Sequence, residues 1–425
     1  MPLLHSQPKA TDAVASSDAQ QASQQPTEAQ PTGAGVNTGA GITRSKSSEE
    51  IEADRLYEEA MEEEYAKRNG GMPFWNKILN STFLQNMEAI VAQAIKDTGA
   101  ARKSSVPWAP DKPHPQAYHT FDPATSSWTT RSPSDTDEAK APDDSNSSIT
   151  NIALYTWNID FMLPFAQARM RPALSYLDAL TKPIPPTTAS VIFLQECVPS
   201  DLVTIAATPW VRERYHLTDL DSTNWATSHY GTVTLVDARL PITAAFRVHY
   251  SQTRMERDAF FVDVAVGPDA KKIRLCNSHL ESLALDPPFR PPQMQLIAHY
   301  LHEEHVYAGL TAGDFNAIQT FDRTLHVDNN LKDAYLELGG KEDDGKGFTW
   351  GQQAATKLRE QFGCSRMDKV YFCGGVKLLK FDRFGEDVLA EGEDEGKQIV
   401  ELGFEKPWVT DHLGVTAEFQ VSPKS

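Results

Sequence analysis

The sequence has 425 residues, 58 of them acidic and 40 basic, which gives a formal net charge of −18. This charge argues against general affinity for nucleic acid unless basic residues gather on one face, because neutralising phosphates is the main sequence-independent source of that affinity. No apolar run approaches the roughly 18 residues that cross a bilayer, and no secretory signal is recognisable. We therefore expect an intracellular protein of the nucleus or cytoplasm, with no membrane contact. The four scattered cysteines lack zinc-site spacing and predict reduced thiols.

The first third of the chain differs from the rest in composition. Residues 1–46 contain almost no large apolar side chains, which predicts a disordered tail. Residues 47–101 predict an acidic helix that begins with a capping-box pattern, followed by an amphipathic helix. The acidic helix either binds a protein partner or is solvated, and its weak apolar line favours the second interpretation. Residues 102–150 read as a Pro-, Ser- and Asp-rich connection whose aromatic residues should pack against a surface: Trp108, Tyr118, Phe121 and Trp128.

From 151 to 421, short apolar runs are separated by turn signals and a few helical stretches, which predicts one domain of the α/β class. Helical patterns run over about 165–180, 293–305 and 321–338. Many short strands with few helices argue for two packed mixed sheets flanked by helices, not for a doubly wound parallel sheet. The candidate strands are residues 152–158, 190–196, 231–237, 244–250, 258–266, 272–280, 310–316, 368–374 and 413–419.

Polar and ionisable residues recur where these strands end or begin. They are Asn158 and Asp160, Glu196, His279, Asp314 and Asn316, and Asp411 and His412. Each position alone has a structural explanation, such as a turn, a buried histidine or a solubility charge, but their joint occurrence indicates a site on a stiff scaffold.

These residue types suit hydrolysis of a phosphate ester. Oxygen ligands suit Mg²⁺ or Mn²⁺ better than zinc, and we expect Glu196 to bind the ion with Asp160, Asn158 and Asp411 nearby. His279 and His412 can donate hydrogen bonds to phosphate oxygens as charge builds there. Asp314 is placed to orient and deprotonate the attacking water.

Six short motifs occur in the order found in one enzyme family: TWNID at 156–160, LQE at 194–196, SHLES at 278–282, GDFN at 313–316, RMD at 366–368 and TDH at 410–412. On these motifs the chain resembles the endonuclease/exonuclease/phosphatase family. Within it, SHLES, the FTWG at 348–351 and the phrase KLREQFGCSRMDKVYF are most similar to the type-2 tyrosyl-DNA phosphodiesterases.

The resemblance implies a four-layered α/β sandwich that uses Mg²⁺, with Mn²⁺ as a substitute, to hydrolyse 5′-phosphotyrosyl-DNA adducts and leave a 5′-phosphate. It also implies roles. Glu196 binds the metal directly, with Asp160, Asn158 and Asp411 beside it. Asp314 positions the water, while the pair of Asp368 and His412 stabilises the pentavalent phosphate. The implied phosphate contacts are Asn316, His279 and Ser282, and Trp350 lines the DNA groove.

The sequence departs from the family pattern at three places. Phe161 stands where Gly is usual, Ile318 stands where an Arg is expected, and a Pro-rich insertion occupies 286–292. Arg323 is a candidate substitute for the missing Arg. Other phosphodiester substrates remain alternatives, namely abasic DNA, an exonuclease substrate, RNA or a nucleotide, and a catalytically weak scaffold is a more distant one. A basic groove would have to draw on Arg247, Arg254, Arg257, Arg290, Arg323, Arg366 and Lys369.

Overall fold

The computed structural model describes residues 106–133, 149–227 and 229–421. The tail predicted over 1–46 and the two helices predicted within 47–101 lie outside the described residues. Among the residues described, none of the helices combines the length and the hydropathy that a membrane crossing requires.

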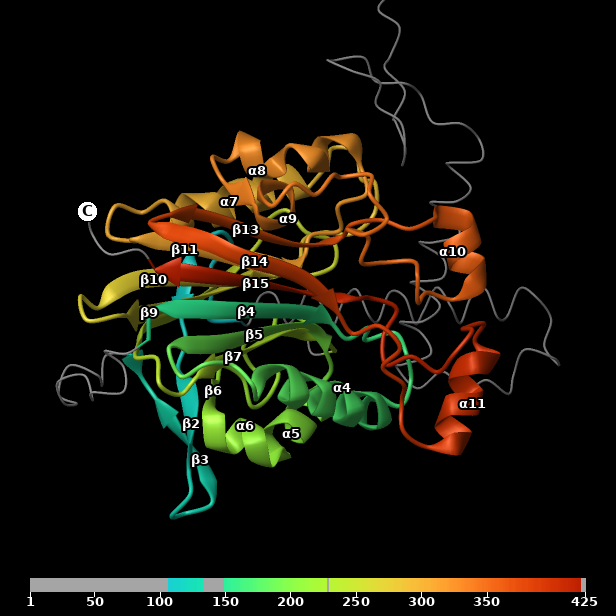
Figure 1. Cartoon of the computed structure of the whole chain (residues 1–425), viewed down its shortest axis with the longest axis horizontal. Coiled ribbons are helices and arrows are strands. Elements are labelled where there is room, and N and C mark those ends of the chain that lie inside the picture. Colours follow the sequence, from blue (N-terminus) through green and yellow to red (C-terminus); the bar gives the residue numbers. More distant parts are fainter. Residues whose placement is uncertain (1–105, 134–148, 228, 422–425) are drawn as a thin grey trace, which may run out of the picture. The chain divides into compact units, whose positions relative to one another are not determined.

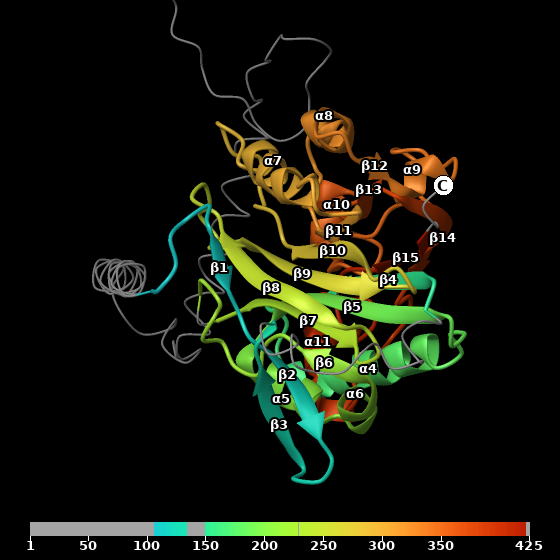
Figure 2. The same cartoon turned by 90° about the vertical axis from the view of Figure 1, so that its left-hand side faces the viewer.

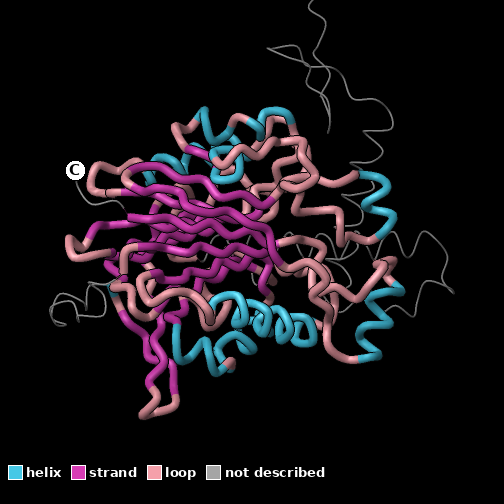
Figure 3. Tube along the Cα trace, in the orientation of Figure 1, coloured by secondary structure: helices cyan, strands magenta, loops and turns pink. Residues whose placement is uncertain are grey.

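The strands form two mixed sheets (Figures 1 and 3). The order in the seven-stranded sheet is β1-β8-β9-β10-β11-β13-β12, and in the eight-stranded sheet it is β14-β15-β4-β5-β7-β6-β2-β3. The strands of the first sheet are Pro113–Pro115, Ile242–His249, Asp258–Val266, Lys271–Ser278, Ala308–Asp314, Asp368–Gly374 and Lys332–Asp333, in that order. Those of the second are Val376–Phe384, Gly414–Val421, Asn151–Asn158, Thr188–Cys197, Gly231–Asp237, Tyr215–Leu217, Tyr118–Asp122 and Ser127–Arg131.

The main hydrophobic core lies between the two sheets. Alternate residues of each strand face it, for example Leu154 of β4, Leu275 of β10 and Leu310 of β11, all fully buried. The outer face of the eight-stranded sheet packs on α4 (Ala166–Thr181), α5 (Pro199–Ala207) and α6 (Pro209–Arg214). The outer face of the other sheet packs on α7 (Arg290–Leu301) and α8 (Leu325–Asp328). The resulting four layers confirm the predicted sandwich (Figure 1).

The predicted strands are all present, whereas the helix predictions are mixed. The pattern at 165–180 forms α4, and the pattern at 293–305 forms α7 a few residues earlier. The single helix predicted over 321–338 is wrong. That stretch divides into a short 3-10 helix, α8, β12 and α9 (Ala334–Glu337). Asn330 adopts a left-handed backbone conformation (φ 55°) that ends α8, and the Asp333 side chain then caps α9 by accepting from the backbone N–H groups of Tyr335 and Leu336.

The stretch interpreted as a connection supplies three strands, β1 to β3, that extend both sheets (Figure 2). β1 pairs with β8, and β2 pairs with β6 and β3. Buried Gln116 fixes this segment. Its amide donates to the Thr218 carbonyl at 2.7 Å and to Asp219 at 3.1 Å, and its oxygen accepts from Arg247. Its aromatic residues do pack, as expected; the Trp128 indole donates to the Ala206 carbonyl at 3.0 Å.

The sheet topology brings the predicted site residues to one edge. β4 runs parallel to β5, and β10 runs parallel to β11, so the carboxyl ends of each pair meet at the same side. β13 and β15 are antiparallel to their neighbours β11 and β4, and they therefore begin at that same edge. Residues at the ends of β4, β5, β10 and β11 can therefore meet residues at the beginnings of β13 and β15, although they lie far apart in the sequence.

Candidate active site

Glu196 is displayed by a β-bulge near the end of β5. The pairing of β5 with β7 shifts register between Leu194 and Cys197, and Glu196 itself has a positive φ of 57°. A β-bulge changes the direction in which a side chain points, and residues other than glycine rarely adopt a positive φ. The backbone conformation of Glu196 is therefore energetically unfavourable at a position proposed to be functional. The carboxylate is anchored by the backbone N–H of Phe161, which donates to Oε2 at 2.9 Å.

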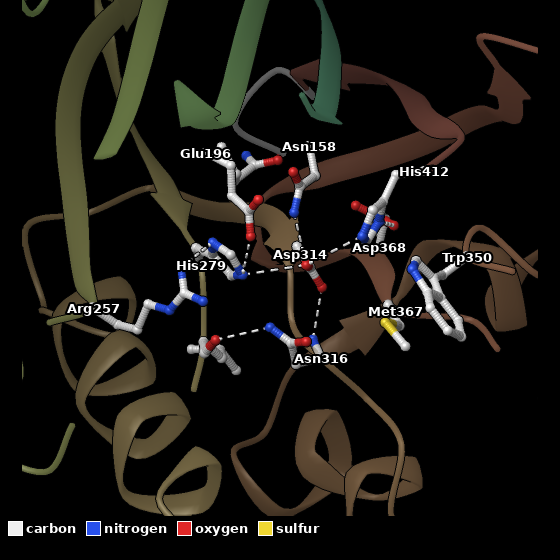
Figure 4. Close-up of polar contacts among 12 residues, drawn as sticks. Asn158, Glu196, Arg257, His279, Asp314, Asn316, Trp350, Met367, Asp368 and His412 are labelled. Atoms are coloured by element: carbon white, nitrogen blue, oxygen red, sulfur yellow. Dashed lines mark hydrogen bonds and ion pairs between the residues drawn. The ribbon is translucent and has the colours of Figure 1, made fainter. Parts of the chain in front are cut away.

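Asp314, at the end of β11, is the centre of the polar network (Figure 4). Its Oδ2 accepts from the Asn158 amide at 3.0 Å and lies 3.2 Å from Nε2 of His279. Its Oδ1 accepts from the backbone N–H of Asn316 at 2.9 Å. Burial opposes ionisation of this carboxyl, but His412 and His279 outweigh it and hold the pKa of Asp314 below its ordinary value.

A glycine allows the close approach of the two strands that carry Asp314 and His279. Gly313 has a φ of 151°, and a Cβ at this position would lie 1.7 Å from the backbone oxygen of Ser278. A side chain would therefore force β10 and β11 apart at their active ends. The Leu280 N–H also donates to the Asp314 carbonyl at 3.0 Å, which locks the two motifs together.

His412 and Asp368 form a buried pair on the far side of Asp314 (Figure 4). Nδ1 of His412 lies 2.8 Å from Oδ2 of Asp368, and Nε2 lies 3.8 Å from oxygens of both Asp314 and Asp411. Burial would lower the pKa of His412, but the carboxylates of Asp368, Asp411 and Asp314 raise it well above its ordinary value. The carboxylates therefore favour the protonated form of His412, and in that form Nε2 can donate.

The tautomer of His279 follows from its neighbour Arg257. A guanidinium only donates, and Nη1 of Arg257 lies 2.6 Å from Nδ1 of His279, so Nδ1 accepts. The neutral ring then carries its proton on Nε2, which faces Asp314 at 3.2 Å. Arg257 also lies over the ring of Tyr230, 5.0 Å from its centroid, and Tyr230 stacks on Phe161 at 4.2 Å. Phe161, which stands where Gly is usual in the family, thus lies beside Glu196.

Three carboxylates interact electrostatically and form an acidic corner: Asp160, Glu196 and Asp411. Burial, and then the charges of Asp411 and Glu196, raise the pKa of Asp160 to about 7. Such mutual repulsion is what a bound cation relieves, and oxygen donors suit a hard ion. The indole of Trp350 donates to Oδ2 of Asp411 at 2.6 Å, so Trp350 contacts this corner.

A second acidic group competes for the metal assignment. Within the described ranges, Asp314, Asp368 and His412 have ligand atoms that all lie within 4.8 Å of one another. A histidine must be deprotonated to bind a metal, and the carboxylates around His412 raise its pKa. This group therefore suits a cation less well than the corner with Glu196, which offers oxygen donors only.

Some predicted site residues are not brought into the network. Arg323 forms an exposed ion pair with Asp343, at 2.9 Å between Nη1 and Oδ2. Ser282 is buried, and its hydroxyl does not join the contacts around Asp314. The Asn316 side-chain amide donates to the Leu280 carbonyl at 3.0 Å and so braces the loop. Of the basic residues considered for a groove, most are buried, namely Arg247, Arg257, Arg290, Arg366 and Lys369.

Two supporting residues were not assigned to the site from the sequence. Arg257 was considered only as a groove residue, and nothing in its spacing from His279 indicates their contact. Thr349 accepts through Oγ1 from the backbone N–H groups of Met367 at 3.1 Å and Asp368 at 3.0 Å, so it fixes the strand that carries Asp368. The sequence indicated Thr349 only through its place next to Trp350 in the motif FTWG.

One family model and several solved structures are similar to this chain. The family model described as Endonuclease/Exonuclease/phosphatase family matches residues 155–412. A comparison with curated protein sequences found no match. Similar solved structures include a humanized D. rerio TDP2 with 14 mutations (18% identity, 64% of this chain, 99% of that chain, TM-score 0.49). A truncated Caenorhabditis elegans TDP2 has 22% identity, 64% and 97% coverage and a TM-score of 0.48.

A third similar structure is D. rerio TDP2 complexed with single strand DNA product (19% identity, 64% and 99% coverage, TM-score 0.48). The family model spans more than half of the chain and includes Glu196, His279, Asp314 and His412. The chain therefore belongs to the Endonuclease/Exonuclease/phosphatase family and is a phosphodiesterase, in a family where dependence on a divalent metal is typical.

Proposed function

We propose that this chain hydrolyses 5′-phosphotyrosyl-DNA adducts in DNA repair, leaving a 5′-phosphate, with Mg²⁺ held by Glu196, Asp160 and Asp411. One arrangement carries the proposal. A carboxylate, Asp314, is held between two histidines, and the metal corner lies beside it. Water activation, phosphate charge stabilisation and metal binding thus have separate groups at one sheet edge.

The metal corner would supply the charge that the phosphate needs. A divalent cation bound there would neutralise developing charge on the phosphate oxygens and on the departing phenolate. Glu196 is the central ligand, because its bulge directs it and the Phe161 N–H orients its second oxygen. The raised pKa of Asp160 means that binding at neutral pH would release part of a proton from this group.

Asp314 orients the attacking water. Its Oδ2 faces both Asn158 and His279, so the carboxylate has a fixed direction. Because the pKa of Asp314 is lowered, it is a weak base, and we assign it the acceptance of the water proton late in the attack. The water oxygen then bonds to phosphorus while the bond from phosphorus to the tyrosine oxygen breaks.

The two histidines stabilise charge on the phosphate from opposite sides. Asp368 holds His412 in place and favours its protonated form, which donates from Nε2. His279 donates from Nε2 because Arg257 occupies Nδ1. Donors fixed before the reaction lower the barrier without reorganising during it.

The choice of substrate rests on the leaving group and on the motifs SHLES and FTWG. A tyrosine leaves as a phenolate with a pKa of about 10, so it needs little acid assistance. A nuclear or cytoplasmic location fits this role, and a protein partner for the acidic N-terminal helix stays a prediction, since that segment is outside the described residues.

Substrate competition tests the proposal. The full chain is given a 5′-phosphotyrosyl oligonucleotide, an abasic duplex and a ribonucleotide oligomer, each with Mg²⁺, with Mn²⁺ and with EDTA. We expect the fastest turnover on the phosphotyrosyl end and none in EDTA. An Asp314→Asn preparation controls for contaminating nucleases. Faster cleavage of the abasic or ribonucleotide substrate would assign the site to one of the alternatives instead.

A further inference from the structure

Arg169 is a buried arginine in the first turns of α4, and only 1% of its surface is exposed. All five N–H donors of its guanidinium are directed at backbone carbonyl oxygens. Nε donates to Pro164 at 2.9 Å, Nη1 to Ile159 at 2.5 Å and Val409 at 2.7 Å, and Nη2 to Asp160 at 2.9 Å and Leu163 at 2.8 Å. A guanidinium has five such donors and keeps its charge in proteins. Arg169 is therefore positively charged, and each of its five donors has an acceptor.

The accepting carbonyls belong to the two loops that carry carboxylates of the metal corner. Four of them lie in the loop between β4 and α4, which carries Asp160. The fifth, Val409, lies two residues before Asp411 in the segment that leads into β15. A second bond joins the same segment to the end of β4, because Oγ1 of Thr410 donates to the Asn158 carbonyl at 2.9 Å. Arg169 therefore sets the distance between two segments that come from opposite ends of the domain.

The charge of Arg169 matters as much as its hydrogen bonds. Burying an arginine costs several kcal/mol unless its surroundings compensate. Here the compensation is a ring of five carbonyl dipoles whose oxygens accept from the guanidinium. The positive charge lies against the backbone of Asp160, one of the three carboxylates proposed to bind the metal.

We propose that Arg169 is a positioning residue for the divalent cation: it clamps together the two loops that carry Asp160 and Asp411 and so fixes where their carboxylates lie. The inference rests on the metal corner of the proposed function. It adds that metal affinity depends on a side chain that does not itself ligate. Removing such supporting groups typically costs about 10- to 100-fold in metal affinity.

Direct metal binding tests this role without using turnover. Tb³⁺ serves as the probe, since the Trp350 indole lies 2.6 Å from an Asp411 oxygen and can sensitise its luminescence. Mg²⁺ affinity follows from its competition with Tb³⁺. Arg169→Met removes the charge and all five N–H donors of the guanidinium, whereas Arg169→Lys keeps the charge and loses most of the donors. Arg274→Met is the matched control, because Arg274 is also buried and pairs with Asp263.

We expect Arg169→Met to weaken the affinity for Tb³⁺ and Mg²⁺ by about 10- to 100-fold, and Arg169→Lys to weaken it less. Arg274→Met should lower the melting temperature while changing the affinity by less than about twofold. Unchanged metal affinity in a folded Arg169→Met or Arg169→Lys protein would overturn the inference. If Arg169→Met does not fold, the Lys variant decides alone.

The wild type separates failure of this inference from failure of the proposed function. Tb³⁺ luminescence in the wild type that Glu196→Gln greatly reduces would support the metal corner, and the Arg169 variants then test the clamp. If the wild type gives no sensitised luminescence that Mg²⁺ displaces, the metal corner is wrong, and the inference about Arg169 is wrong with it.

Discussion

Replacing Asp314 with Asn tests the centre of the site with the smallest change of shape. Both carboxylate oxygens of Asp314 accept from N–H donors, Oδ1 from the Asn316 backbone at 2.9 Å and Oδ2 from the Asn158 amide at 3.0 Å. Nε2 of His279 adds a further donor at 3.2 Å from Oδ2. An amide offers one oxygen and one NH₂ group, so an Asn side chain here must direct its NH₂ at one of these donors.

The magnitudes follow from this geometry. A buried donor that loses its acceptor costs about 1–3 kcal/mol, so we expect a lower melting temperature for Asp314→Asn. The variant also loses the acceptor for the water proton, and a general base typically contributes about 10²- to 10⁴-fold. We therefore expect kcat to fall by roughly 100-fold or more, equivalent to about 2.7 kcal/mol, with little change in substrate binding.

Single-turnover cleavage of a 5′-phosphotyrosyl oligonucleotide measures the effect. His412→Ala should lower kcat by a similar factor, and the double variant should be impaired less than additively, because both residues act on one phosphate. Asp263→Asn is the control: Asp263 is buried and paired with Arg274, so its loss should destabilise the fold and leave kcat unchanged. Rates within about threefold of wild type for the Asp314 and His412 variants would refute the roles assigned here.

Three further predictions concern the metal, the N-terminal segments and stability in acid. EDTA should abolish turnover, Mg²⁺ or Mn²⁺ should restore it, and Glu196→Gln should weaken metal binding in calorimetry; full activity in EDTA would contradict the assignment. Removing residues 1–46 should leave turnover of a chromogenic phosphodiester intact, whereas removing 1–133 should lower the melting temperature, because it deletes β1 to β3. Burial lowers the pKa of His249 to about 4 from 6.5, so its contribution of up to about 3 kcal/mol is present above pH 6.5 and is lost as the pH falls toward 4. His249→Gln should flatten that loss in urea unfolding, and an equally steep loss would assign it to other groups.

The positions of the main site residues could be predicted because they depend on local patterns. Asn158, Glu196 and Asp314 each follow an apolar run, and apolar runs of this length form buried strands whose ends meet at one edge. The direction of Glu196 could not be predicted in this way. It depends on a bulge opposite β7, and such a shift in pairing is a property of two strands and not of either sequence.

The sequence analysis did not predict that most of the arginines considered for a groove are buried. Arg247, Arg290 and Arg366 look like groove cations in a list of basic residues, yet each is paired with a buried aspartate. Their partners are distant in the sequence, so only the fold shows that these charges are used internally. The partners of Arg169 could not be predicted either, because they are backbone carbonyl groups, which every residue carries.

The strands β1 to β3 were hidden by their composition. The segment is rich in Pro, Ser and Asp, and a propensity argument therefore favours loops. Its strands form because β8 and β6 present edges with unpaired backbone groups, and pairing with an existing sheet outweighs weak local preference. The aromatic residues in this segment were the correct signal, because apolar side chains in a polar stretch need a surface to cover.

The burial of these arginines changes how substrate affinity must arise. Five of the seven basic residues considered for a groove are buried, so their charges are not available to DNA phosphates. A divalent cation at the corner with Glu196 would then be the largest positive charge near the reacting phosphate. Metal and substrate should consequently strengthen each other's binding, and by thermodynamic linkage the two effects must be equal. On this reasoning Arg169, which holds the metal corner together, influences substrate affinity without touching the substrate.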